Sequence, residues 1–275
     1  MNLQGFSLII QGQKQNPKGV SIDDFETHAH YDDEQFDEDR EQLLAGLQEA
    51  GIETVVNVGA TLEGCLSTIR LAEQYPFIYA AVGVHPDEVG TLDEEKFSWL
   101  KEKLSHEKVV AVGEIGLDYY WDQESHEVQK KWFLRQLEAA REAGLPVIIH
   151  SREAAADTLE MMKEYGQDLK GIIHCYSYSV EHAREYVKMG YLLGIGGVVT
   201  FKNARKLKEV VEEIPLEALV LETDCPYLAP VPNRGKRNSS LNLPLIAEEI
   251  AAIKQISCEE VITQTRENAR KLFGV

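Results

Sequence analysis

The chain has 275 residues, of which 44% are hydrophobic and 27% are charged, as in ordinary folded globular proteins. Its 28 basic and 46 acidic side chains give a formal net charge of -18, which argues against broad, sequence-independent adhesion to nucleic acid or to an anionic membrane. No apolar run approaches the roughly 20 residues of a membrane helix, so we expect no membrane association.

Residues 1–20 are a polar, Gly- and Gln-rich extension of unknown role, for which a flexible tail, an extra edge strand and a cloning artefact all stay open. Their one short apolar run, at 6–10, has no basic region before it and no small-residue cleavage site after it, so we expect no secretory signal. The four cysteines are scattered and form no C-x-x-C motif, which predicts reduced thiols and a cytoplasmic location.

From residue 21 onward, short apolar runs alternate with amphipathic stretches. The runs predict strands at 25–30, 53–59, 78–86, 109–118, 146–152, 171–177, 192–200 and 219–227. The amphipathic stretches predict helices at 37–50, 62–74, 94–104, 126–143, 154–165, 180–189, 204–213, 244–254 and 259–273, and several of them end before a glycine, which is a helix stop signal.

This strict alternation predicts an α/β protein with a parallel sheet, and eight repeats in one domain-sized chain favour a closed (β/α)8 TIM barrel. A doubly wound open sheet is the alternative. Because no Pro-, Ser- or Gly-rich linker interrupts residues 21–275, we expect them to form one domain.

Barrel active sites lie at the C-terminal ends of the strands, and six chemically capable residues fall there. They are His28 and His30 on the first predicted strand, Glu114 on the fourth, His150 on the fifth, His174 on the sixth and Asp224 on the eighth. One histidine after an apolar strand is more often a core residue than a ligand. Four at the same structural position of different strands predict a metal site.

Six nitrogen and oxygen ligands exceed the needs of one tetrahedral zinc and suit two divalent ions that share a carboxylate, for which Glu114 is the natural bridge. Such a pair would activate a water and clamp a phosphoryl or carbonyl oxygen, which predicts a hydrolase. We expect Asp224 to bind metal and to act as general base, so Glu114 and Asp224 are the predicted catalytic residues. Glu222, on the same strand face, is either a support for the ligands or a structural carboxylate paired with Arg or Lys.

Six segments resemble, in order, the TatD family of metal-dependent deoxyribonucleases in the amidohydrolase superfamily. They are Thr-His-Ala-His at 27–30, Gly-Glu-Ile-Gly-Leu-Asp at 113–118, His-Ser-Arg at 150–152, His-Cys-Tyr-Ser at 174–177, Glu-Thr-Asp-Cys-Pro-Tyr-Leu-Ala-Pro at 222–230 and Gly-Lys-Arg-Asn at 235–238. The chain departs from the family at its start, where the His-x-His pair usually comes within a few residues, and at Tyr176, where many members have phenylalanine.

The resemblance implies a TIM barrel and a two-metal hydrolase that acts as a 3'-to-5' exonuclease on DNA ends, often on single strands. It also implies the ligand sets, which are His28, His30, Glu114 and Asp224 for one metal and Glu114, His150 and His174 for the other. Four imidazoles favour Zn or Mn, whereas members of the family are commonly active with Mg.

A DNA-cleaving site needs cations beside the phosphates that flank the scissile bond. The candidate contacts are Arg152, which shares a strand face with His150, and Lys236, Arg237 and the amide of Asn238 in the loop after the eighth strand, together with Arg234. A basic cluster at 202–208 is either a further phosphate site or a solvated helix face. His85 either contacts substrate or shapes the loop before Pro86. Tyr119, Tyr120 and Trp121 either stack on a base or plug the loop.

The leading hypothesis is therefore a phosphodiesterase acting on DNA ends, more often monomeric than oligomeric. A second hypothesis keeps the metals but changes the bond, giving a deacylase or esterase on a small or tRNA-linked substrate, because similar barrel rims cleave several bond types. A third is a binding or scaffold protein with a vestigial site, against which the six intact ligands speak.

Overall fold

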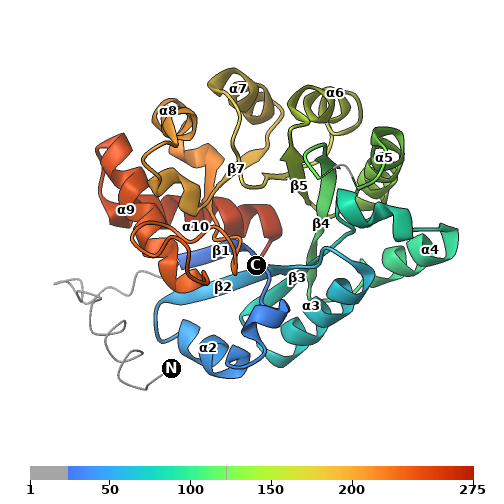
Figure 1. The fold of residues 1–275 in the computed structure, drawn as a ribbon, viewed down its shortest axis with the longest axis horizontal. Coiled ribbons are helices and arrows are strands. Elements are labelled where there is room, and N and C mark those ends of the chain that lie inside the picture. Colours follow the sequence, from blue (N-terminus) through green and yellow to red (C-terminus); the bar gives the residue numbers. More distant parts are fainter. Residues whose placement is uncertain (1–23, 122) are drawn as a thin grey trace.

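Eight parallel strands follow one another around a barrel in the order β1 to β8, with helices outside them, in the computed structural model (Figure 1). The structure describes residues 24–121 and 123–275. The predicted (β/α)8 barrel is confirmed. The strands are β1 Asp24–Ala29, β2 Ile52–Val58, β3 Ile78–Val82, β4 Val109–Asp118, β5 Val147–Arg152, β6 Gly171–Ile173, β7 Leu192–Ile195 and β8 Leu219–Leu221.

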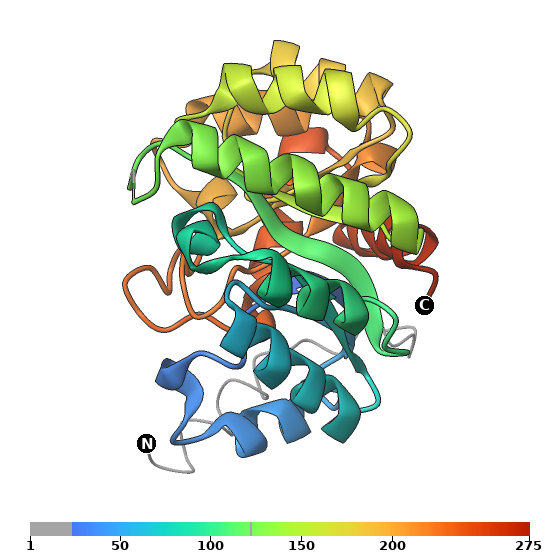
Figure 2. The same cartoon turned by 90° about the vertical axis from the view of Figure 1, so that its right-hand side faces the viewer.

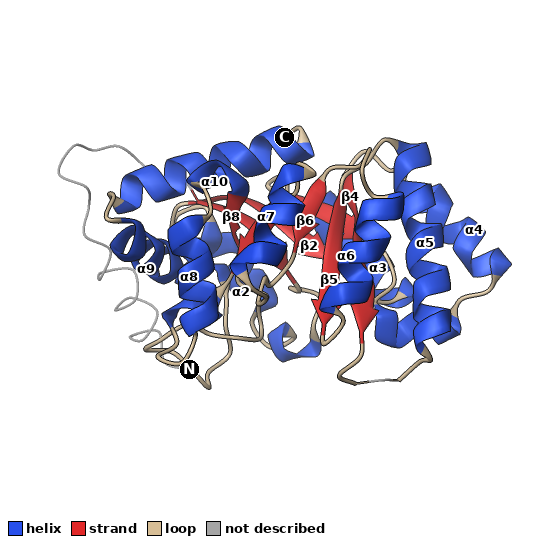
Figure 3. Ribbon diagram, turned by 90° about the horizontal axis from the view of Figure 1, so that it is seen from above, coloured by secondary structure: helices blue, strands red, loops and turns tan. Residues whose placement is uncertain are grey.

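The helices form the outer layer around these strands (Figure 3). They are α2 Arg40–Leu47, α3 Leu62–Gln74, α4 Glu94–Lys103, α5 His126–Ala143, α6 Ala155–Tyr165, α7 Val180–Lys188, α8 Arg205–Glu213, α9 Leu243–Lys254 and α10 Cys258–Phe273. In the described ranges no helix combines the length and the apolar character needed to cross a membrane. The predicted extension at 1–20 lies outside the described residues.

Four strands end earlier than predicted, at residues 82, 173, 195 and 221 instead of 86, 177, 200 and 227. Apolar composition continues past these ends, but the extended backbone does not. Pro86 opens the 3-10 helix η2 (Pro86–Thr91), and η3 (Gly197–Thr200) follows β7. Cys175 and Asp224 adopt positive φ angles of 46° and 56°, which break an extended chain. His174 and Asp224 therefore lie in the loops that follow β6 and β8.

Apolar side chains fill the barrel, and α10 closes its N-terminal end. The ring of Phe273 in α10 stacks on Phe25 of β1 with centroids 5.9 Å apart. The side-chain amide of Asn268 donates to the carbonyls of Leu216 and Leu219 at 2.9 and 2.8 Å, which holds α10 beneath β8. In Figure 2 α10 lies at one end of the barrel, and the loops after β4 and β8 project from the other. Only that second end is free for a site.

The barrel closes where β1 meets the loop after β8. Ala29 and Cys225 form a parallel bridge, the backbone N–H of His30 donates to the carbonyl of Cys225 at 2.8 Å, and that of Asp224 donates to the carbonyl of His28 at 3.0 Å. We call this contact the seam. It places residues from the two ends of the barrel sequence directly beside each other.

The side chain of Glu26 lies beneath the seam and is fully shielded from solvent. It accepts hydrogen bonds from the backbone N–H of His28 at 3.2 Å, from the N–H and hydroxyl of Thr223 at 2.8 and 2.6 Å, and from the hydroxyl of Ser240 at 2.9 Å. Burial raises the pKa of Glu26 to about 8, although these hydrogen bonds oppose the shift. Glu26 thereby ties β1, β8 and the later loop together.

We expect Gly116→Ala to destabilise the barrel strongly. Gly116 has a φ of +148°, and a Cβ there would lie 1.9 Å from the carbonyl oxygen of His150 on the neighbouring strand. Backbone strain and the clash together should cost about 3 kcal/mol of unfolding free energy. Gly144→Ala is the matched control, because Gly144 also has a positive φ but nothing lies near its missing Cβ, so it should cost only about 1 kcal/mol. Urea unfolding measures both, and equal costs would contradict the prediction.

Candidate metal centre

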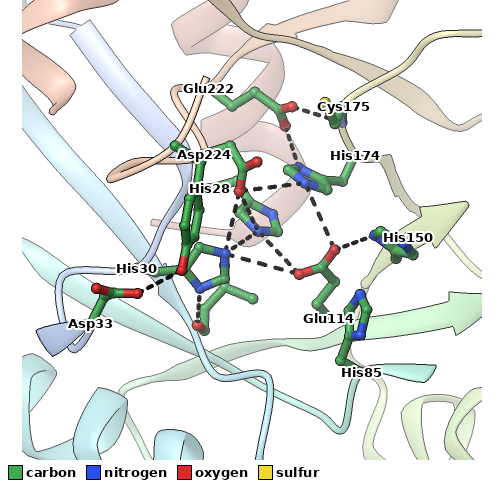
Figure 4. A network of polar contacts seen from close by, with 12 residues as sticks. His28, His30, Asp33, His85, Glu114, His150, His174, Cys175, Glu222 and Asp224 are labelled. Carbon is green, nitrogen blue, oxygen red and sulfur yellow. Dashed lines mark hydrogen bonds and ion pairs between the residues drawn. The ribbon is translucent and has the colours of Figure 1, made fainter. Parts of the chain in front are cut away.

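Glu114, at the C-terminal half of β4, lies between two pairs of histidines (Figure 4). Its Oε2 is 3.5 Å from Nε2 of His28 and 4.0 Å from Nε2 of His30. Its Oε1 is 2.7 Å from Nδ1 of His150 and 3.7 Å from Nε2 of His174. Each carboxylate oxygen thus faces a different pair of imidazoles, which is the arrangement required of a carboxylate shared by two cations.

Asp224 closes the other side of the group. Its Oδ1 lies 3.4 Å from Nε2 of His30, 3.9 Å from Nε2 of His28 and 3.8 Å from Nε2 of His174. The Nε2 atoms of His28 and His30 face each other at 3.1 Å. The structure thereby brings all six predicted ligands to one place.

The chemistry of this donor set fits a divalent cation. Two triplets, His28–His30–Glu114 and His28–His174–Asp224, each offer ligand atoms within 4.8 Å of one another. Among the described residues, no Lys or Arg side chain forms an ion pair with Glu114 or Asp224, so the positive charge that buried carboxylates require has to come from imidazolium or from metal.

A carbonyl and a carboxylate oxygen fix the orientation of two of the rings, those of His30 and His174. Nδ1 of His30 donates to the Val58 carbonyl at 2.8 Å. Nδ1 of His174 donates to Oε2 of Glu222 at 3.1 Å, while Oε1 of Glu222 accepts from the backbone N–H of Cys175 at 2.7 Å. Both bonds leave Nε2 of the ring free to act as a ligand. Glu222 thus orients the predicted ligand His174, as in the first of its two predicted roles.

Sequence reasoning missed the role of Asp118. This buried residue ends β4, and its Oδ2 accepts from Nε2 of His150 at 2.9 Å, which turns Nδ1 of the ring toward Glu114. Its Oδ1 accepts the backbone N–H groups of Tyr120 and Trp121 at 2.9 and 3.0 Å. Because side chains two apart on a strand share a face, the spacing from Glu114 to Asp118 was a signal that could have identified it.

His85 lies against the same group. Its ring meets that of His150 edge to face, with centroids 4.3 Å apart. Its Nδ1 accepts the backbone N–H of Asp87 at 3.2 Å, so His85 caps η2 and shapes this loop. Burial lowers the pKa of His85 to about 3, and the charge of His150 adds to the shift, so the ring is neutral. A contact with substrate stays a prediction.

The predicted phosphate-binding side chains differ in their solvent exposure and in the bonds they already make within the protein. Arg152 is exposed, whereas Arg237 is engaged in a two-pronged ion pair with Asp39, at 2.7 and 2.6 Å. Asn238 is buried and donates to the carbonyls of Thr223 and Tyr227 at 2.9 and 2.8 Å.

In this geometry Arg237 and Asn238 brace the loop after β8, and their roles toward phosphate stay predictions, as does that of the exposed Lys236. In the 202–208 cluster, Lys208 pairs with Glu249 at 2.6 Å.

A parallel eight-stranded barrel with imidazoles and carboxylates converging at the C-terminal ends of its strands defines a class, the barrel metal-dependent hydrolases. The sequence profile of the family described as TatD related DNase matches residues 25–274, and the chain belongs to this family.

The curated relatives and solved structures agree with that assignment. The uncharacterized metal-dependent hydrolase YabD of Bacillus subtilis is 46% identical over 252 residues, which cover 91% of this chain and 99% of YabD. The uncharacterized metal-dependent hydrolase YcfH of Escherichia coli is 34% identical, covering 91% of this chain and 95% of YcfH. The crystal structure of YjjV, a TatD homolog from Escherichia coli, superimposes with a TM-score of 0.86 at 30% identity, covering 93% and 99% of the two chains.

Metal binding is expected to release protons and to strengthen as pH rises. In His28, burial and the charge of His174 lower the pKa. In the other three ligand histidines, burial is outweighed by bonds and charges from nearby carboxylates, which raise the pKa of His30 to about 10 and those of His150 and His174 to about 9. These rings are therefore protonated near neutral pH in the metal-free protein and must lose their protons to bind a cation.

Calorimetric titration with Zn in buffers of different ionisation enthalpy, between about pH 6 and 9, measures both effects. The expected result is an affinity that climbs with pH, with one proton displaced for each ring that is still protonated. A pH-independent affinity without proton release would contradict these charge states.

Proposed function

We propose that this protein is a two-metal phosphodiesterase that removes nucleotides from the 3' ends of DNA, with a preference for single strands. The observation that carries the proposal is the division of the two Glu114 oxygens between two pairs of histidines. One ion would be held by His28, His30, Glu114 and Asp224, and the other by Glu114, His150 and His174.

Two bound divalent ions supply Lewis-acid activation of water and neutralise charge on the phosphoryl group. The chain's own residues position the reaction. Glu114 is ionised, because the charge of His174 and the bonds from His150 and His28 outweigh burial and hold its pKa well below the usual range. Glu114 is almost fully covered, with 6% of its side chain exposed, whereas 17% of the Asp224 side chain is exposed. Asp224 is thus the carboxylate better placed to accept a proton from an incoming water.

Two features support a phosphodiester over a carboxylic ester or amide. One is the family match, whose description is that of a DNase. The other is Arg152, an exposed cation two residues beyond His150 on β5, where a guanidinium can pair with a phosphate next to the scissile bond. This support is local, since the chain as a whole has a net charge of -18.

We further propose that the protein acts as a monomer in the cytoplasm. All four cysteines are free thiols, and Cys65 and Cys225 are buried, as suits a reducing compartment.

The direct test is digestion of 5'-labelled single- and double-stranded DNA in the presence of Mg, Mn or Zn. The wild-type protein should shorten single strands progressively from the 3' end. Glu114→Ala should lower the rate by about a thousandfold or more, because losing the shared carboxylate removes several kcal/mol of transition-state stabilisation. Glu95→Ala, an exposed glutamate on α4, is the control and should cleave as the wild type does.

Other outcomes of this assay separate the alternatives. Cleavage of a model ester or amide without cleavage of DNA would replace the nuclease by a deacylase or esterase. Less than one ion per chain after metal loading, with no hydrolysis of any substrate, would leave a scaffold protein. Undiminished DNA cleavage by Glu114→Ala would refute the proposed centre.

A further inference from the structure

Exposed large hydrophobic side chains gather beside the metal centre. In the part of the chain that the structure describes, they lie on two loops only. Tyr120 and Trp121, each 55% exposed, follow β4, and Tyr227, Leu228 and Val231, at 49%, 39% and 46%, follow β8. Both loops project from the end of the barrel that α10 leaves open (Figure 2). Solvent-exposed aromatic rings around a polar site are typical of a ligand-binding surface.

Tyr120, Trp121 and Arg152 form one composite surface, which we call the platform. The guanidinium carbon of Arg152 lies 4.0 Å from the ring centroid of Tyr120 and 5.5 Å from that of Trp121. The two rings stand nearly perpendicular, at 84°, with centroids 5.1 Å apart. A flat cation and two exposed aromatic faces therefore meet in a single patch.

The platform is held at a fixed place relative to the metal centre by Asp118. One oxygen of this carboxylate accepts the backbone N–H groups of Tyr120 and Trp121, and the other accepts Nε2 of His150. The Asp118 side chain thus connects the backbone that carries the rings to a predicted metal ligand. Arg152 also lies two residues beyond His150 on β5, so the platform and the metal centre are neighbours at the same end of the barrel.

Tyr119, the neighbouring aromatic, does not belong to this surface. Its ring stacks on His126 with centroids 3.5 Å apart, and its hydroxyl donates to Asp157 at 2.7 Å. Tyr119 therefore anchors the loop to the helices behind it. Tyr120 and Trp121 contact Arg152 and each other but are still 55% exposed, which favours contact with a ligand over a plug of the loop.

We propose that the platform is a base-stacking subsite, which takes the nucleobase next to the scissile phosphodiester while Arg152 pairs with a phosphate. This inference rests on the proposed function and adds the groups that hold the substrate. Stacking suits every base, so binding should tolerate any sequence. It also gives an acidic protein a way to hold DNA with few cations, which predicts a weak dependence of affinity on salt.

The first measurement compares two single-stranded substrates of equal length, an oligo-dT and one with abasic residues at its last three positions. Tyr120→Ala and Trp121→Ala should each lower kcat/KM on oligo-dT about tenfold, mainly through a higher KM, and leave the abasic substrate nearly unaffected. Trp99→Ala is the matched control, because Trp99 is also partly exposed and has a cation, Lys103, over its ring at 5.2 Å, but lies on α4. It should change neither rate.

The second measurement needs no turnover. Phosphorothioate-linked oligo-dT, which resists cleavage, should quench the tryptophan fluorescence of the metal-loaded protein. Trp121→Phe should abolish most of that quenching, whereas Trp99→Phe should not, and Trp132 is buried. Thermal unfolding of the Tyr120 and Trp121 variants should match the wild type, since these exposed rings add little to the core.

The outcomes separate this inference from the proposed function. Quenching by oligo-dT without any cleavage would refute the nuclease and keep the subsite. Cleavage of oligo-dT at the wild-type rate by both alanine variants would refute the subsite and keep the nuclease. Equal losses on the oligo-dT and abasic substrates would also overturn the subsite, because they would mean that the rings act only on the structure of the loop.

Discussion

The seam between β1 and the loop after β8 is the contact on which the centre depends. His28 and Asp224 are joined there through their backbones, and Glu26 beneath them accepts hydrogen bonds from β1 and from the loop after β8. An unpaired polar group so deeply buried would cost several kcal/mol, and here four hydrogen bonds offset that cost. The position of the first pair of histidines relative to the last carboxylate is therefore set by a network that no substrate touches.

Around this fixed point the centre is built in two layers. Imidazoles and carboxylates converge inside, and Asp118, Glu222 and the Val58 carbonyl hold the rings from outside. The outer groups do more than orient. Asp118 also accepts the backbone N–H groups of Tyr120 and Trp121, so that one carboxylate holds both a ligand ring and the next loop. In a chain with a net charge of -18, this arrangement concentrates cation affinity at one end of the barrel.

The sequence predicted the fold and the convergence of the six residues because both follow from simple periodicity. Parallel strands place their C-terminal ends at one rim, so His150 and Glu114 had to approach each other. The predicted strand ends were wrong where the backbone leaves the extended conformation within an apolar run. Asp224 is an example, because nothing in the sequence around it indicates its positive φ angle. The pairing of Arg237 with Asp39, separated by 198 residues, depends on tertiary proximity and could not be read from the loop alone.

The seam also has a consequence for the order of events during synthesis. Glu26 and Thr223 are 197 residues apart in the sequence. The hydrogen bonds between them can therefore form only after almost the whole barrel sequence has left the ribosome. Closing so long a chain segment is slow compared with forming local helices. Until the barrel closes, His28 and His30 lack the other predicted ligands and would bind a metal ion only weakly. A metal site that uses residues from both ends of the barrel sequence would therefore form only once the barrel is complete.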